Sequence, residues 1–134
     1  MLEYRIESRR VDDTGSVAER GAAVVSLDTS LAGRPDALNP VELLLAALSA
    51  CMLKGIERAA PMLKFEFRSA SVRLHAIRQD TPPRLVSIDY ELTIDTDEPD
   101  RRLDLLHLNV IRYGTISNTL AAAVRIDGKI SRAN

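Results

Sequence analysis

The stretch NPVELLLAALSACMLK, residues 39–54, decides the fold of this chain. Its opening reads as a helix start. Asn39 can accept a hydrogen bond from an early helix amide, the proline after it needs no donor, and Glu42 can reach back to the cap. These residues predict a helix over positions 40 to about 59, and Pro61 should end it because proline lacks an amide donor.

The first turns of this predicted helix are apolar on every side, and charge first appears at Lys54. A helix without a polar face must be covered all round. In a chain of 134 residues, one sheet covers one side of such a helix, so the other side should pack on a second copy. The helix therefore predicts a homodimer. Its apolar residues are Leu43, Leu44, Leu45, Ala46, Ala47, Leu48, Ala50, Met52 and Leu53.

The flanking segments alternate between apolar and polar residues, as strands do. In the N-terminal third, residues 2–6 and 23–27 predict two antiparallel strands around a polar turn at residues 12–16, followed by a surface loop at 28–38. After the helix, residues 65–76 and 86–94 predict the two longest strands, joined at Thr81-Pro82-Pro83.

A second helix should begin at Asp97-Glu98-Pro99-Asp100 and break at Gly114. Residues 117–123 predict a further short helix, and residues 124–130 a closing turn or short strand. This order of elements predicts an α+β fold, with antiparallel sheets packed around the long apolar helix. The length predicts a single domain over residues 1–134.

Composition excludes several classes of function. With 18 basic and 19 acidic residues, the chain lacks the positive charge that binding nucleic acid needs. Its longest apolar run is far shorter than the roughly 20 residues of a membrane span. Charged residues interrupt the N-terminus where a secretion signal would be apolar, so we expect a cytoplasmic protein. The glycine-rich loops that bind nucleotide cofactors are missing, and we expect no cofactor.

The single cysteine, Cys51, is the first candidate for chemistry. It cannot form a disulfide within the chain or build a cysteine-rich metal site. Ala47 and Ala50 would leave room for a small substrate at its sulfur. A thiol becomes a useful nucleophile when a nearby cation or helix dipole favours the thiolate, but a lone buried cysteine is also common as a small apolar packing residue. Both interpretations stay open on the sequence alone.

Other polar residues have a structural and a functional interpretation each. Glu42 suits a helix cap better than catalysis, because it falls on the opposite helix face from Cys51. His107 suits a hydrogen-bonded structural histidine, with a general acid or base near the cysteine as the alternative. Neither His107 nor His75 has a second ligand at metal spacing, and we predict no metal site. The cation for a thiolate could come from Arg9, Arg10, Arg20 or Arg34, although exposed arginines are usually solvated.

Two stretches resemble the OsmC/Ohr family of osmotically induced and organic hydroperoxide resistance proteins. The first is GRPDALNPVELLLAALSAC, residues 33–51, and the second is RYGTISNTL, residues 112–120. Asp28 and the long hairpin after the helix agree with the same family. The resemblance implies an intertwined α+β homodimer in which Cys51 is the peroxidatic cysteine, which attacks an organic hydroperoxide and becomes a sulfenic acid.

The chain departs from the family pattern at two positions. Gly114 stands where the family has its second cysteine, so the sulfenic acid would need an external thiol. Val41 stands where the family has an acid that orients an arginine toward the thiolate. The resemblance therefore implies a one-cysteine thiol peroxidase or thiol-redox protein of oxidative-stress defence, acting on a small apolar hydroperoxide. Two alternatives stay open: a non-catalytic protein that binds a ligand or senses oxidation, and a hot-dog-type thioesterase using Glu42.

Overall fold

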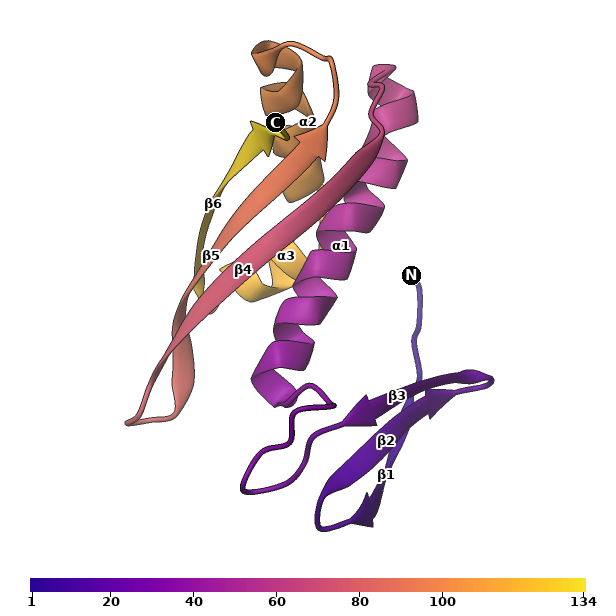
Figure 1. Cartoon of the computed structure of the whole chain (residues 1–134), viewed down its shortest axis with the longest axis vertical. Helices are drawn as coiled ribbons and strands as arrows, with labels where there is room; N and C mark the ends of the chain where they lie inside the picture. Colours follow the sequence, from indigo (N-terminus) through magenta and orange to yellow (C-terminus); the bar gives the residue numbers. More distant parts are fainter. The chain divides into compact units, whose positions relative to one another are not determined.

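The computed structural model describes residues 1–134, which form two compact units, Met1–Ala46 and Ala47–Asn134 (Figure 1). Helix α1, Pro40–Leu63, begins in the first unit and continues into the second. Each unit has its own three-stranded sheet, and the second also holds two shorter helices. The fold is α+β, as predicted. That residues 1–134 form a single domain stays a prediction. No helix is both long enough and apolar enough to span a membrane.

The N-terminal sheet has three antiparallel strands in the order β1-β2-β3, where two were predicted. The strands are β1, Glu7–Asp12, β2, Gly15–Arg20, and β3, Ala23–Leu27. Residues 2–6 lie outside any strand, so that part of the prediction is wrong. The predicted polar turn is shorter than expected, because the Asp12 carboxylate accepts hydrogen bonds from the amide and hydroxyl of Thr14 at 2.8 and 2.6 Å. That tight turn frees the polar residues after it to form β2.

The loop between β3 and α1 is organised around a buried carboxylate. Asp28 accepts hydrogen bonds from the Ser30 hydroxyl and amide and from the Arg34 amide, at 2.6, 3.0 and 3.1 Å. These donors, the Ser30 hydroxyl first among them, hold the pKa of Asp28 below its ordinary value. The Asp28 amide also donates to the carbonyl of Leu38 at 2.9 Å, which closes the loop just before α1 begins. The predicted loop is confirmed.

Helix α1 begins as predicted but ends later. Asn39 and Glu42 form a reciprocal capping box, each accepting the other's backbone amide at 2.9 Å. Pro61 lies inside the helix instead of ending it. The carbonyl that its missing amide leaves free belongs to Glu57, on the exposed side, where water can satisfy it. The helix ends at Lys64, whose φ of 52° is left-handed, with the Phe65 amide donating back to the Ala60 carbonyl at 2.8 Å.

The second sheet has the order β4-β5-β6. Strands β4, Ser69–Gln79, and β5, Arg84–Asp95, form the predicted antiparallel hairpin, whose apolar residues pair on one face, as Leu74 does with Tyr90. The register between β4 and β5 shifts beyond Ile77. Val86, which was predicted to share a face with the other apolar residues of its strand, has 36% of its surface exposed. A β-bulge adds one residue to a strand, which changes the face that later residues occupy.

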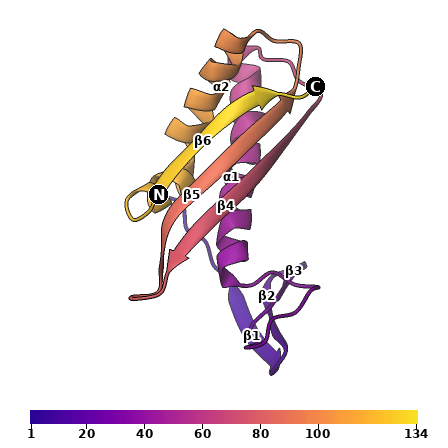
Figure 2. The same ribbon diagram turned by 60° about the vertical axis from the view of Figure 1, so that its left-hand side comes forward.

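Two helices and a last strand complete the second unit. They are α2, Asp100–Arg112, α3, Thr115–Ala121, and β6, Arg125–Arg132. Gly114 separates the two helices, as predicted. Figure 2 shows α1 and α2 on the same face of the sheet. Strand β6 runs parallel to β5, and Gly128 lies opposite Tyr90 in its register. The Asp127-Gly128 pair therefore lies within a strand and not in a turn. The Tyr90 ring lies so close over Gly128 that a side chain there would overlap it.

Candidate functional site

Cys51 lies half-buried in α1, within the second unit. Gly55 follows it by four residues and Arg58 by seven, so the three positions share one side of the helix. Gly55 packs directly against α2, because a Cβ atom there would lie 3.3 Å from Cγ1 of Val110. The side of α1 that carries Cys51 is therefore the side that meets α2.

Helix α2 runs antiparallel to α1. At its start, the Arg102 guanidinium donates to the carbonyls of Leu63 and Lys64, at 2.7 and 3.0 Å, where α1 ends. Near its end, Val110 contacts Gly55 in the middle of α1. The two helices therefore run in opposite directions along the face where they meet.

Arg58 joins α1 to the end of α2. Its guanidinium donates to the backbone carbonyls of Asn109 and Tyr113, both at 3.3 Å, and to Oδ1 of Asn109 at 3.2 Å. The guanidinium carbon also lies 5.7 Å from the centroid of the Tyr113 ring. A cation at a helix C-terminus is favourable, because unpaired carbonyls gather there. The sequence analysis did not single out Arg58, although its spacing of seven residues from Cys51 was a usable signal.

Gly114 and Ser117 lie together at the bend between α2 and α3. A Cβ atom on Gly114 would lie 3.0 Å from the Val110 carbonyl oxygen and 3.1 Å from Oγ of Ser117, so this position is crowded. Ser117 is 4% exposed, and its hydroxyl is buried without a hydrogen-bond partner. The sequence analysis did not mark Ser117 as a functional residue, since nothing in its neighbours reveals an unsatisfied hydroxyl.

The other predicted residues have structural partners. The Glu42 carboxylate accepts the Asn39 amide in the capping box, in agreement with the capping interpretation. His107 forms a 2.5 Å hydrogen bond between its Nε2 and the Tyr90 hydroxyl, which joins α2 to β5 and agrees with a structural histidine. His75 is exposed on β4, where it lies opposite Asp89 in the register of the hairpin. No group of three His, Cys, Asp or Glu side chains is placed to hold a metal ion.

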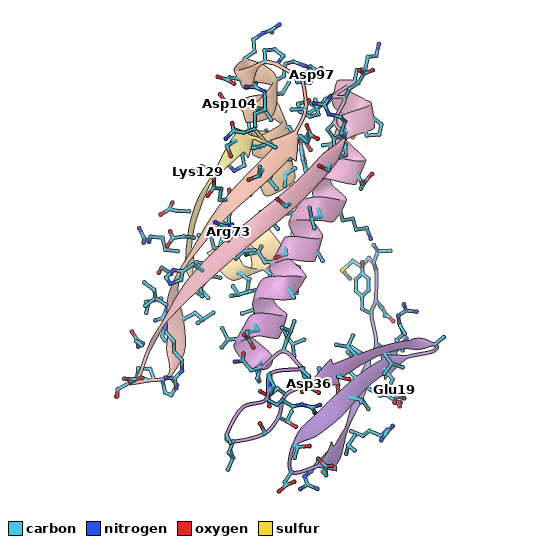
Figure 3. The ribbon with its side chains drawn as sticks, in the orientation of Figure 1. Glu19, Asp36, Arg73, Asp97, Asp104 and Lys129 are labelled. Carbon is cyan, nitrogen blue, oxygen red and sulfur yellow. The ribbon has the colours of Figure 1, made fainter.

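Tyr90 is buried and His107 is partly buried, and their surroundings shift both pKa values away from the charged forms. Burial lowers the pKa of His107 from its ordinary value, against a smaller opposing effect of Asp104. Burial also raises the pKa of Tyr90, and the charge of Asp127 adds to this. Both rings are therefore favoured in their neutral forms. Figure 3 labels Asp104 on α2, the helix that carries His107.

The four candidate arginines belong to the N-terminal unit. Arg9 pairs with Glu19 at 3.2 Å, and Arg34 binds both carboxylate oxygens of Asp36 at 2.7 and 2.9 Å. Both of these acids are labelled in Figure 3. Arg10 and Arg20 are exposed. Which of these arginines, if any, serves Cys51 stays a prediction.

Comparison with known proteins gives a consistent result. Residues 33–129, which include Cys51, Gly114 and Ser117, match the family model described as OsmC-like protein. No curated protein matches the sequence. Among solved structures, an OsmC-like protein from Mycoplasma pneumoniae has a TM-score of 0.89 and 19% identity, with 99% of each chain covered.

Two further similar structures carry hydroperoxide resistance in their names. The organic hydroperoxide resistance protein OsmC from Legionella pneumophila, a predicted redox protein, has a TM-score of 0.77 and 20% identity over 98% of this chain and 99% of that one. The organic hydroperoxide resistance protein OhrB of Bacillus subtilis has a TM-score of 0.68 and 15% identity, over 97% of this chain and 98% of that one. At such identities these structures show a shared fold.

Proposed function

Because the chain belongs to the OsmC-like family, we propose that it reduces organic hydroperoxides with Cys51 as its only redox-active thiol. The observation that carries this proposal is the position of the cysteine. Cys51 lies inside the matched segment, at the middle of α1, and stays partly accessible. The names of the similar proteins from Legionella pneumophila and Bacillus subtilis support the same chemistry.

The reaction needs no cofactor. The Cys51 thiolate attacks the outer oxygen of the hydroperoxide, so that an S–O bond forms and the O–O bond breaks. The alkoxide leaves, takes a proton and becomes an alcohol, while the cysteine becomes a sulfenic acid. The apolar sequence of α1 on both sides of Cys51 favours an apolar substrate over hydrogen peroxide.

Return of Cys51 to its thiol requires a reductant from outside the chain. With Gly114 at the position of the second family cysteine, an external thiol attacks the sulfenic sulfur, forming a mixed disulfide and releasing water. A second thiol attacks the mixed disulfide, which releases the Cys51 thiol and joins the two external thiols in a disulfide. We place this cycle in the cytoplasm, where thiol reductants are abundant.

We also propose that the protein acts as a homodimer. Large apolar side chains of the N-terminal unit are exposed, including Tyr4, Ile6, Val24 and Val25. On α1, Ala47 and Ala50 are exposed as well. Exposed apolar side chains of this kind are typical of an interface, and they agree with the apolar sequence of α1.

Intact-mass spectrometry after addition of cumene hydroperoxide and a sulfenic-acid trap tests the proposal. The reduced protein should gain one trap molecule rapidly, and Cys51→Ser should gain none. Glu42→Ala is the matched control, because it removes a cap and leaves the thiol intact; its trapping should be unchanged. Trapping no faster than with a free thiol would overturn the proposal and leave Cys51 as a packing residue.

Peroxide consumption under excess dithiol separates the proposal from the oxidation-sensor alternative. An enzyme consumes many equivalents of peroxide per Cys51, whereas a sensor consumes one. The thioesterase alternative required a hot-dog fold. The chain has the OsmC-like fold instead, which removes the basis of that alternative.

A further inference from the structure

A cavity of about 660 Å³ lies at the C-terminal end of α1, within the second unit. Three segments line it: the last turns of α1, the link from α1 to β4, and the turn from β5 to α2. Figure 3 labels Asp97, which lies on that turn beside the end of α1. Cys51 is not among the lining residues, so the thiol chemistry proposed above does not use this cavity. Its volume suits a small organic molecule.

The walls of the cavity are partly apolar. Phe65 and Phe67 both line it, with ring centroids 6.5 Å apart and ring planes inclined at 41°. Pro61 and Pro99 add apolar surface from the end of α1 and the start of α2. Phe65 is 5% exposed, so packing holds this part of the wall in place, and Phe67 is partly exposed. An aromatic ring offers a ligand both apolar contact and a face that attracts cations.

Several hydrogen-bond acceptors at the cavity have no donor from the chain. The side-chain carboxylates of Glu57 and Glu66 form no hydrogen bond or ion pair. The backbone carbonyl of Glu57 is also free, because Pro61, four residues later in the helix, has no amide to donate to it. Exposed carboxylates are ordinarily solvated. These two, however, share a cavity with a free helix carbonyl and two aromatic rings.

The cavity has an excess of negative charge, since four acidic residues and one basic residue line it. The basic residue, Arg68, is already engaged, because all three of its side-chain nitrogens donate to Asp95 or Asp97 at 2.8–3.1 Å. Glu98 binds Arg102 at 2.9 Å. The other two acids of the lining are those described above, and neither has a counter-ion. A ligand that complements this lining brings N–H donors and positive charge.

We propose that this cavity binds an organic amine as an ammonium ion that carries an apolar or aromatic body. The N–H groups donate to the free carbonyl of Glu57 and to the carboxylates of Glu57 and Glu66. The apolar body lies against Phe65 and Phe67. A metal ion does not fit, because no group of three acidic, His or Cys side chains is placed to hold one. An anion would be repelled by the lining. This inference does not depend on the function proposed above.

Two matched ligands test the site on the wild-type protein by NMR. Phenethylamine hydrochloride should shift the backbone amide signals of Glu57, Glu66 and Phe67. Phenethyl alcohol has the same aromatic body without the charge, and it should bind about fivefold more weakly because it forms no charge-assisted hydrogen bond. Added salt should weaken binding of the amine and leave binding of the alcohol unchanged, because salt screens exposed charges.

Variants of the lining test the acceptors. Glu57→Gln combined with Glu66→Gln should weaken binding of phenethylamine about fivefold and leave binding of phenethyl alcohol unchanged. Pro61→Ala supplies the missing amide, so it should weaken amine binding about threefold by removing one acceptor. Glu7→Gln is the matched control, since Glu7 is an exposed acid on β1 in the other unit, and its binding should match the wild type.

Three results would overturn the proposal. The first is equal affinity for the amine and the alcohol, and the second is unchanged affinity in the variant that lacks both carboxylates. The third is the absence of amine-dependent shifts at this end of α1, which is also the result expected if a second copy of the chain covers the cavity.

Discussion

Two polar side chains on the α2–α3 segment, partly buried His107 and buried Ser117, have opposite environments. His107 has a partner, the Tyr90 hydroxyl at 2.5 Å, and burial shifts the pKa of each ring in the direction that favours its neutral form. Ser117 has none. A satisfied pair stabilises the packing of a helix on a sheet, whereas burying an unsatisfied hydroxyl costs free energy. The first group therefore stabilises the fold, whereas the second lowers its stability.

A glycine accompanies each group and sharpens the contrast. Gly128 lies under the Tyr90 ring with no room for a side chain. At Gly114 the nearest atoms to a Cβ would be 3.0 and 3.1 Å away, which is tight but not blocked. The fold depends on the first glycine more than on the second.

The largest effect should come from Gly128→Ala. Its methyl group would overlap the Tyr90 ring, which His107 holds in place, so we expect a loss of about 3 kcal/mol in the free energy of unfolding. Gly114→Ala should lose only about 1 kcal/mol, because small shifts relieve its contacts. Urea unfolding measures both. Equal midpoints for the two variants would break the comparison.

Tyr90→Phe should have the next largest effect. It leaves His107 without its partner and should cost about 1–2 kcal/mol of unfolding free energy. Because the pair lies outside the chemistry, the rate of sulfenic-acid trapping at Cys51 should not change. Ser117→Ala should not lower the stability, because the hydroxyl that it removes has no hydrogen-bond partner. A slower reaction of Tyr90→Phe with peroxide, at full folding, would place this pair in the reaction.

The pH dependence of stability should be smaller. The pKa of His107 in the folded protein lies below its ordinary value of 6.5, so the unfolded chain binds a proton first as the pH falls. The contribution of His107 is complete above about pH 6.5 and is lost as the pH decreases through the folded pKa. Urea midpoints between pH 7.5 and 5 should decline, and His107→Gln should decline less. Equal pH slopes for the wild type and His107→Gln would contradict a lowered pKa of His107 in the folded protein.

The smallest effect should come from Lys64→Gly. This position, outside both groups, has a left-handed φ of 52° that glycine adopts without strain. The variant should gain about 0.5–1 kcal/mol of unfolding free energy with no change in peroxide chemistry. The gain in stability of Lys64→Gly, compared with the result for Ser117→Ala, separates the effect of backbone strain from the effect of an unsatisfied hydroxyl. No gain would mean that the lysine side chain compensates for the strain.

Local patterns predicted much of this fold. The Asn39–Glu42 capping box, the hairpin after α1 and the break at Gly114 follow from residue types and spacing. Strands β1 and β2 escaped prediction because they carry few apolar residues, Val11 in the first and Val17 and Ala18 in the second. Pro61 was wrongly predicted to end the helix. It lies on the exposed side of α1, where water can replace the lost hydrogen bond, and this exposure depends on the tertiary structure.

The candidate site was only half predictable. Cys51 is conspicuous as the single cysteine of an apolar helix. The Tyr90–His107 bond, the close approach of Gly55 to Val110 and the isolated hydroxyl of Ser117 depend on how distant segments pack. No spacing rule within one segment encodes such contacts.

The most direct test of the central claim counts peroxide equivalents. Wild type and Cys51→Ser, at equal concentration and with excess dithiol, would be given cumene hydroperoxide while its disappearance is followed. We predict that the wild type consumes many equivalents per chain and that Cys51→Ser consumes no more than the dithiol alone. Consumption of a single equivalent by the wild type, or equal consumption by the two proteins, would contradict a peroxidase centred on Cys51.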